Sequence, residues 1–129
     1  MWLPVTASTA IGAGALVAWS SGKLIAATST TASSDIAGVL LKAITSSDSD
    51  YASERLVAVE VPAEKYVVWE ADVTSGLVAA DRGLYQDLTD SVTVNRGAST
   101  YDIVQCVKVI STTKGWFILN IGPDARAKA

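Results

Sequence analysis

Short apolar runs separated by polar turns are the feature that most constrains how this chain can fold. Eight runs rich in Val, Ile, Leu and aromatic residues stand between clusters of Ser, Thr, Gly and Asp: Ala15–Trp19, Lys23–Ala26, Ile36–Leu41, Leu56–Val61, Tyr66–Trp69, Val92–Val94, Ile103–Ile110 and Trp116–Leu119. Runs of this length with turn signals between them are typical of the strands of an antiparallel sandwich or barrel. We therefore predict a mostly β fold, a small antiparallel β-barrel or sandwich with at most one short helix.

Turn signals add detail to this prediction. Ser20–Lys23 and Thr112–Gly115 each separate two apolar runs by a few residues that include glycine, which is the spacing of a β-hairpin. Leu56–Val61 partly alternates along its length, and Pro62 ends that strand because proline has no amide hydrogen to donate. Thr74–Gly83 is the strongest candidate for a short helix.

One pattern of glycine, strand, turn, short strand, polar loop and strand occurs twice in the chain. Gly14 and Gly83, which begin the two copies, lie 69 positions apart. Asp35-Ile36 and Asp102-Ile103, which begin the last strand of each copy, lie 67 apart, so the copies differ by about two loop residues. This pattern predicts a pseudo-repeat of hairpin-plus-strand units around a common core, with Leu56–Trp69 between them.

The chain contains no histidine. Nucleophilic sites of the Ser-His-Asp and Cys-His kinds, and zinc sites that use histidine, are therefore excluded. The single cysteine, Cys106, lies in an apolar run and is predicted to be a small buried core residue. One cysteine cannot form a disulfide within the chain, which is consistent with folding in a reducing compartment.

Charge and hydropathy argue against two kinds of partner. Ten basic and 13 acidic residues give a net charge of -3, so no basic surplus is present to neutralise the phosphates of nucleic acid. No stretch approaches the roughly 20 apolar residues that a membrane helix requires. Ile11–Trp19 is as apolar as a signal segment, but no Lys or Arg precedes Lys23, so we expect a strand there. We predict neither nucleic acid nor a membrane as a partner.

Acidic residues provide the remaining candidates for chemistry. Asp48, Asp50 and Glu54 could attract calcium, but the glycine of a calcium-binding turn is missing, and a solvated loop is favoured. Paired carboxylates could also hydrolyse glycosides. The nearest candidates for such a pair are Glu60, Glu64, Glu70 and Asp72. We nevertheless predict that the chain is not an enzyme and has no catalytic, metal or cofactor residues.

The four tryptophans are Trp2, Trp19, Trp69 and Trp116. We expect two or three of them to pack in the core. Tryptophans left at the surface could instead form a platform for carbohydrate, because the indole ring combines an apolar face with a polar N–H.

Both ends of the chain depart from the pattern of the middle. Residues 1–8 begin with an apolar segment that is predicted to be a contact arm outside the β domain of 9–121. Residues 122–129 lose the apolar pattern and are predicted to be a flexible tail. The residues expected to contact a partner or another copy are Trp2, Leu3, Pro4, Val5 and Trp116.

The repeated pattern resembles that of the small capsid decoration, or cement, proteins of tailed bacteriophages. The segments that carry the resemblance are Thr9–Trp19, Ile36–Leu40, Gly83–Tyr85 and Asp102–Val107. In these proteins a glycine-led strand, a polar gap and a strand of the Gly-Val-Leu kind occur twice. This chain departs from that pattern at Gln105, where the second copy would have glycine.

The resemblance implies a structural virion protein without catalytic residues. Such a protein is made in the host cytoplasm, binds the major capsid protein on the outer surface of the assembled head, and stabilises the shell against internal DNA pressure. It often does so as a homotrimer. The alternatives are a carbohydrate-binding or fibre-tip β module, a tail-tube or head-closure subunit, and a small glycosidase.

Overall fold

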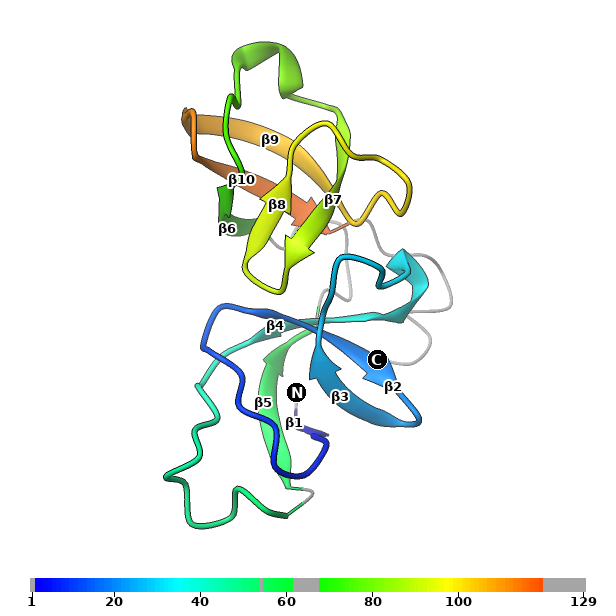
Figure 1. The fold of residues 1–129 in the computed structure, drawn as a ribbon, viewed down its shortest axis with the longest axis vertical. Helices are drawn as coiled ribbons and strands as arrows, with labels where there is room; N and C mark the ends of the chain where they lie inside the picture. The colour runs from blue at the N-terminus through cyan, green and yellow to red at the C-terminus, as the bar shows by residue number, and fades with distance from the viewer. Residues whose placement is uncertain (1, 54, 62–67, 120–129) are drawn as a thin grey trace.

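The computed structural model describes residues 2–53, 55–61 and 68–119 (Figure 1). This part of the chain contains ten β-strands, two single 3₁₀ turns and no α-helix. The strands are β1 (Trp2–Pro4), β2 (Leu16–Ser20), β3 (Lys23–Ala26), β4 (Ile36–Leu40), β5 (Leu56–Glu60), β6 (Val68–Val73), β7 (Tyr85–Asp90), β8 (Thr93–Asn95), β9 (Val104–Ser111) and β10 (Lys114–Leu119). The 3₁₀ turns are η1 (Ser33–Asp35) and η2 (Ala79–Asp81).

The strands form two five-stranded units, which lie one above the other in Figure 1. The strand order is β1-β5-β4-β2-β3 in the first unit. In the second unit, β10-β6-β8-β7-β9 form a closed barrel. A parallel bridge between Val5 and Leu24 joins the end of β1 to β3, so the first sheet also curls round on itself. The prediction of a mostly β protein with a small barrel is therefore confirmed.

Both units have the same topology, strand for strand. In each, the first strand pairs antiparallel with the fifth, the fifth with the fourth, the fourth with the second and the second with the third. The contact between the first and third strands is parallel in both, as the Val5–Leu24 bridge and the β6–β8 ladder show. We refer to the two units as the first and second barrels.

A β-bulge just before the second strand of each barrel allows the two barrels to be aligned residue by residue. In both barrels, a glycine with positive φ donates its N–H to the carbonyl of a residue on the neighbouring strand. The N–H of that residue in turn donates to the carbonyl of the residue that follows the glycine. The bonds are Gly14 N to Leu40 O (2.8 Å) and Leu40 N to Ala15 O (2.9 Å), and Gly83 N to Cys106 O (2.7 Å) and Cys106 N to Leu84 O (3.1 Å). The predicted repeat is therefore present.

The repeated unit is longer than the sequence pattern indicated. The segment Leu56–Trp69, expected to lie between the copies, contributes β5 to the first barrel and the start of β6 to the second. The hairpins predicted at Ser20–Lys23 and Thr112–Gly115 are present, with Ser20 opposite Lys23 and Ser111 opposite Lys114. The helix expected within Thr74–Gly83 is reduced to the η2 turn.

An extra residue in β4 changes which residue of the first copy corresponds to Gln105. The register of β2 with β4 shifts between Val17 and Ala18, which leaves one more residue in β4 than regular pairing needs. Because Leu16 pairs with Val39 as Tyr85 pairs with Gln105, the counterpart of Gln105 is Val39. The counterpart of Gly38 is then Val104, so Gln105 does not replace a glycine.

The first residues of the chain are part of the first barrel, contrary to the predicted contact arm. Trp2–Pro4 forms β1 and pairs with β5. Leu3 and Val5 are buried in the core of their own barrel, so they cannot serve as contacts for a partner. The pairing of β1 with β5 therefore explains why these residues are apolar. The predicted tail, 122–129, lies outside the described residues.

The two barrels are joined by a shared apolar core. Val17 faces the interior of the first barrel, while its neighbours Leu16 and Ala18 pack into the cluster that fills the second. Hydrogen bonds also cross the junction: Leu16 N donates to Ser91 O at 2.8 Å, and Trp69 Nε1 donates to Gly14 O at 2.7 Å. Each barrel is therefore stabilised by its contacts with the other.

Two further predictions about the core are confirmed. Cys106 is fully buried, and this burial raises the pKa of its thiol. Trp69 is buried and Trp19 half-buried, whereas Trp2 and Trp116 remain exposed. No helix in the described ranges is long and apolar enough to cross a membrane.

Candidate interaction surface

The outer side of the β1–β5 ladder carries exposed apolar residues. Trp2 pairs with Ala58 and Pro4 with Leu56, and strand alternation turns these four side chains away from the core while Leu3 faces inward. Trp2 is 68% exposed and Leu56 is 58% exposed. The sequence pattern indicated Trp2 and Pro4 as contact residues but not Leu56.

Leu41 extends this surface from the neighbouring strand. It follows β4, donates its backbone N–H to Ala58 O at 3.0 Å, and is 54% exposed. Together these residues form one apolar surface, the Trp2 face, made of Trp2, Pro4, Leu41, Leu56 and Ala58. Exposed large apolar side chains on adjacent strands are a mark of protein interaction sites.

A hollow of about 420 Å³ lies beside the Trp2 face. Trp2 and Leu56 form its apolar side, and Lys42, Asp48, Asp50 and Arg55 contribute charged groups. Apolar side chains next to polar groups that include Arg are common at protein interfaces.

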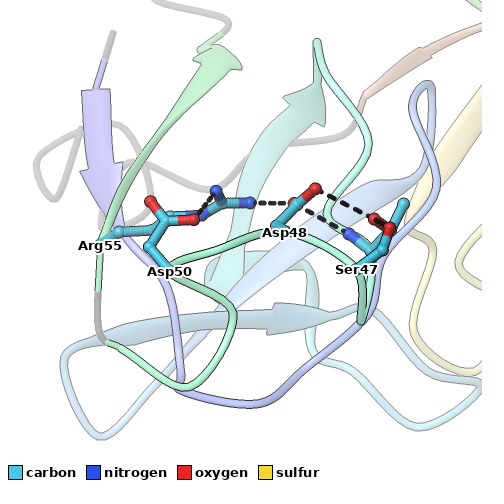
Figure 2. Close-up of polar contacts among 5 residues, drawn as sticks. Ser47, Asp48, Asp50 and Arg55 are labelled. Atoms are coloured by element: carbon cyan, nitrogen blue, oxygen red, sulfur yellow. Dashed lines mark hydrogen bonds and ion pairs between the residues drawn. The ribbon is translucent and has the colours of Figure 1, made fainter.

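The loop between β4 and β5 holds the charged side of the hollow in place (Figure 2). The Arg55 guanidinium lies between two carboxylates, with Nη2 2.7 Å from Asp48 Oδ2 and Nη1 bonded to Asp50. Asp48 also accepts the Thr45 N–H at 3.1 Å and the Thr45 hydroxyl at 3.0 Å. The pKa of the Asp48 carboxyl lies below its ordinary value of 3.8, first because of the Thr45 backbone N–H and next because of Arg55.

These contacts involve the acidic residues that were candidates for calcium binding. Asp48 and Asp50 share Arg55 as their partner, and Glu54 lies outside the described residues. Within the described ranges, no group of three or more His, Cys, Asp or Glu side chains is placed to hold a metal ion.

The carboxylates considered for glycoside hydrolysis are divided between the barrels. Glu60 is on β5 in the first barrel, whereas Glu70 and Asp72 are on β6 in the second, and Glu64 lies outside the described residues. Glu70 Oε1 accepts the Trp116 indole N–H at 3.2 Å, and Asp72 Oδ1 is 3.8 Å from Lys114 Nζ.

Trp116 occupies the position in the second barrel that Ala58 occupies in the first. Its partner across the ladder is Glu70, just as the partner of Ala58 is Trp2. The Lys108 ammonium lies 4.4 Å from the centroid of the Trp116 ring, and the ring is 38% exposed. Trp116 is thus not part of the Trp2 face, and its ring already has a cation–π partner.

Comparison with protein-family models finds no match for this chain, and comparison with curated proteins finds none either.

Acidification should destabilise the fold through Asp81 as well as Asp48. Asp81 is buried, and its pKa lies below 3.8 because it accepts the Val78 backbone N–H and then a hydrogen bond from Arg96. A carboxyl with a lowered pKa stabilises the folded state above its unfolded pKa, and this contribution is lost as the pH falls through its folded pKa. We expect thermal melts to show the melting temperature falling between about pH 5 and pH 2. If the melting temperature of an Asp81→Asn variant fell by as much over this pH range, Asp81 would not be a source of the acid sensitivity.

Proposed function

We propose that this chain is a structural virion protein that binds the outside of an assembled phage capsid and stabilises it. Two features support the proposal: the resemblance of the repeated pattern to capsid decoration proteins, and the Trp2 face. The single observation that carries it is the exposure of Trp2, Leu41 and Leu56 on neighbouring strands of one barrel.

The chemistry of the Trp2 face suits attachment to a protein surface. Tryptophan and arginine are over-represented among the residues that dominate binding energies, and Trp2 stands next to a hollow bordered by Arg55. The Arg55 pairs with Asp48 and Asp50 hold the rim in one arrangement, which lowers the ordering cost on binding.

The partner in this proposal is the major capsid protein. A shell repeats the same surface many times, and a homotrimer of this chain would engage several sites at once, so each copy needs only a modest affinity. The location that follows is the outer capsid surface, reached after synthesis in the host cytoplasm.

Replacing Trp2 with alanine should weaken attachment to the shell. A central tryptophan contributes about 2 to 4 kcal/mol when removed from an interface, so the affinity per copy should fall at least about thirtyfold. The measurement is co-sedimentation of the purified chain with empty, undecorated head shells over a range of concentrations. Because the Trp2 side chain points away from the core, thermal melts should show a folded variant.

Trp116→Ala is the matched control for the loss of an indole ring. Trp116 lies outside the Trp2 face, and we expect its removal to change attachment by no more than about threefold. Undiminished attachment by the Trp2 variant would refute the assignment of this face. Deleting residues 1–6 is not a clean test, because it removes β1 and the buried Leu3 and Val5.

A further inference from the structure

The outer face of the second barrel carries a row of uncharged side chains that crosses β6, β10, β9 and β7 (Figure 1). The ladder registers place Val68 beside Ile118 and Ile118 beside Gln105. Gln105 in turn lies beside Tyr85. Val68 is 51% exposed and Tyr85 44% exposed, while Ile118 and Gln105 are half-buried. We call these four residues the Ile118 row. Exposed apolar side chains on adjacent strands are a mark of contact with protein.

The corresponding row of the first barrel already packs against another barrel. There Leu16 pairs with Val39, and Val39 pairs with Glu60. Leu16 is fully buried in the cluster that fills the second barrel, and Val39 packs against the same cluster. Glu60 is exposed, and its counterpart in the second barrel is Ile118. This position of the repeat is therefore used once, within the chain, for contact with a barrel of the same fold, and the Ile118 row lacks the charge of Glu60.

The row next to the Ile118 row has an acid at one end and a base at the other. Glu70 on β6 and Lys108 on β9 both pair with Trp116 on β10. Glu70 Oε1 accepts the indole N–H, and the Lys108 ammonium lies over the ring. Within the described part of the chain, neither Glu70 nor Lys108 forms an ion pair. The β6 side of this face is therefore acidic and the β9 side basic, which makes it complementary in charge to a second copy of itself.

We propose that copies of this chain associate through this face, with the β6 side of one copy against the β9 side of the next. Glu70 of one copy then meets Lys108 of its neighbour, and the Ile118 row is buried between the copies. A contact between two different sides of the same face is heterologous, and it closes into a ring when a rotation relates the copies. The inference rests on the proposed function only for the number of copies, which is three. The contact itself lies on the second barrel and does not involve the Trp2 face.

The test is the mass of the purified chain in solution, measured by sedimentation equilibrium without head shells at about 1 to 500 µM. We expect the mass to rise with concentration from the 13.4 kDa of one chain to three times that value. A chain that stays monomeric, or that stops at a dimer, would overturn the proposal. Shell attachment through Trp2 is measured separately, so failure of either assignment is seen without failure of the other.

Ile118→Glu installs the residue that the first barrel has at the equivalent position. It should weaken self-association at least about thirtyfold, because a carboxylate would be buried in the contact. Val68→Glu changes a more exposed position and should weaken it at least about tenfold, which keeps the test valid if thermal melts show that the Ile118 variant is unfolded. Leu41→Glu makes the same kind of change on the Trp2 face and should leave self-association unchanged. Undiminished association of a folded Ile118 or Val68 variant, or its loss in the Leu41 variant, would overturn the proposal.

A charge exchange tests the pair between copies. Glu70→Lys and Lys108→Glu should each weaken self-association at least about fivefold, because each sets two like charges against one another. The double variant restores opposite charges and should associate within about threefold of the parent chain. Trp116→Ala should also stay within about threefold, because Lys108 already covers the ring. A double variant as weak as the single variants would overturn the placement of β6 against β9.

Discussion

Replacing Gly38 with alanine should lower the free energy of unfolding by about 3 kcal/mol. A Cβ atom at this position would lie 2.2 Å from Glu60 O and 2.9 Å from Val59 Cγ1. The closest atom belongs to the backbone of β5, so the clash can be relieved only by separating β4 from β5. Equilibrium unfolding in urea, read by tryptophan fluorescence, measures the effect.

Gly12→Ala is the matched control for this substitution. Among the described residues, and apart from the chain neighbours of Gly12, no heavy atom lies within 4 Å of the place a Cβ would take there, and the φ of Gly12 is not positive. We expect its free energy of unfolding to stay within about 0.5 kcal/mol of the parent chain. Equal stability of the two variants would show that β4 and β5 do not approach as closely as the structure places them.

Replacing Asp87 with alanine should cost about 3 kcal/mol of stability as well. The substitution removes the acceptor of three backbone N–H groups, those of Thr100, Tyr101 and Asp102. A hydrogen bond to a charged group contributes more than a neutral one, and donors left without a partner add a desolvation penalty. Urea unfolding gives the total loss, and hydrogen exchange should show faster exchange at these three amides.

Asp90→Ala is the control for loss of an aspartate from the same strand. Asp90 is exposed and accepts one backbone N–H, from Val92 at 2.9 Å. Its loss should cost no more than about 1 kcal/mol. If Asp87→Ala were no more destabilising than Asp90→Ala, the loop after β8 would have to be held by other contacts.

Local patterns in the sequence were enough to predict the fold class. Strand runs such as Lys23–Ala26 and hairpins such as Ser20–Lys23 depend on side-chain period and turn chemistry over a few residues, and both are in the structure. The repeat was recognisable because Gly14 and Gly83 are required for the same bulge. Its full length was missed because β1 and β6 carry no shared residue pattern.

The candidate surfaces were harder to predict. An apolar start of the chain indicated an arm, but β1 pairs with β5 more than fifty residues later, which buries Leu3 and leaves Trp2 outside. Leu41 and Leu56 belong to apolar runs, and nothing in those runs shows that both face solvent beside Trp2. The hollow lined by Asp81, Tyr85 and Arg96 combines η2, β7 and the loop after β8, which only the barrel brings together.

By itself, the sequence determined that this chain forms short strands, that it repeats one strand pattern, and that imidazole chemistry is absent. These properties depend on residue type and on neighbours close in the chain. Only the tertiary structure decided which side of each strand is covered. That choice depends on pairing between distant segments, and one face of a strand becomes a core or a surface according to what packs against it.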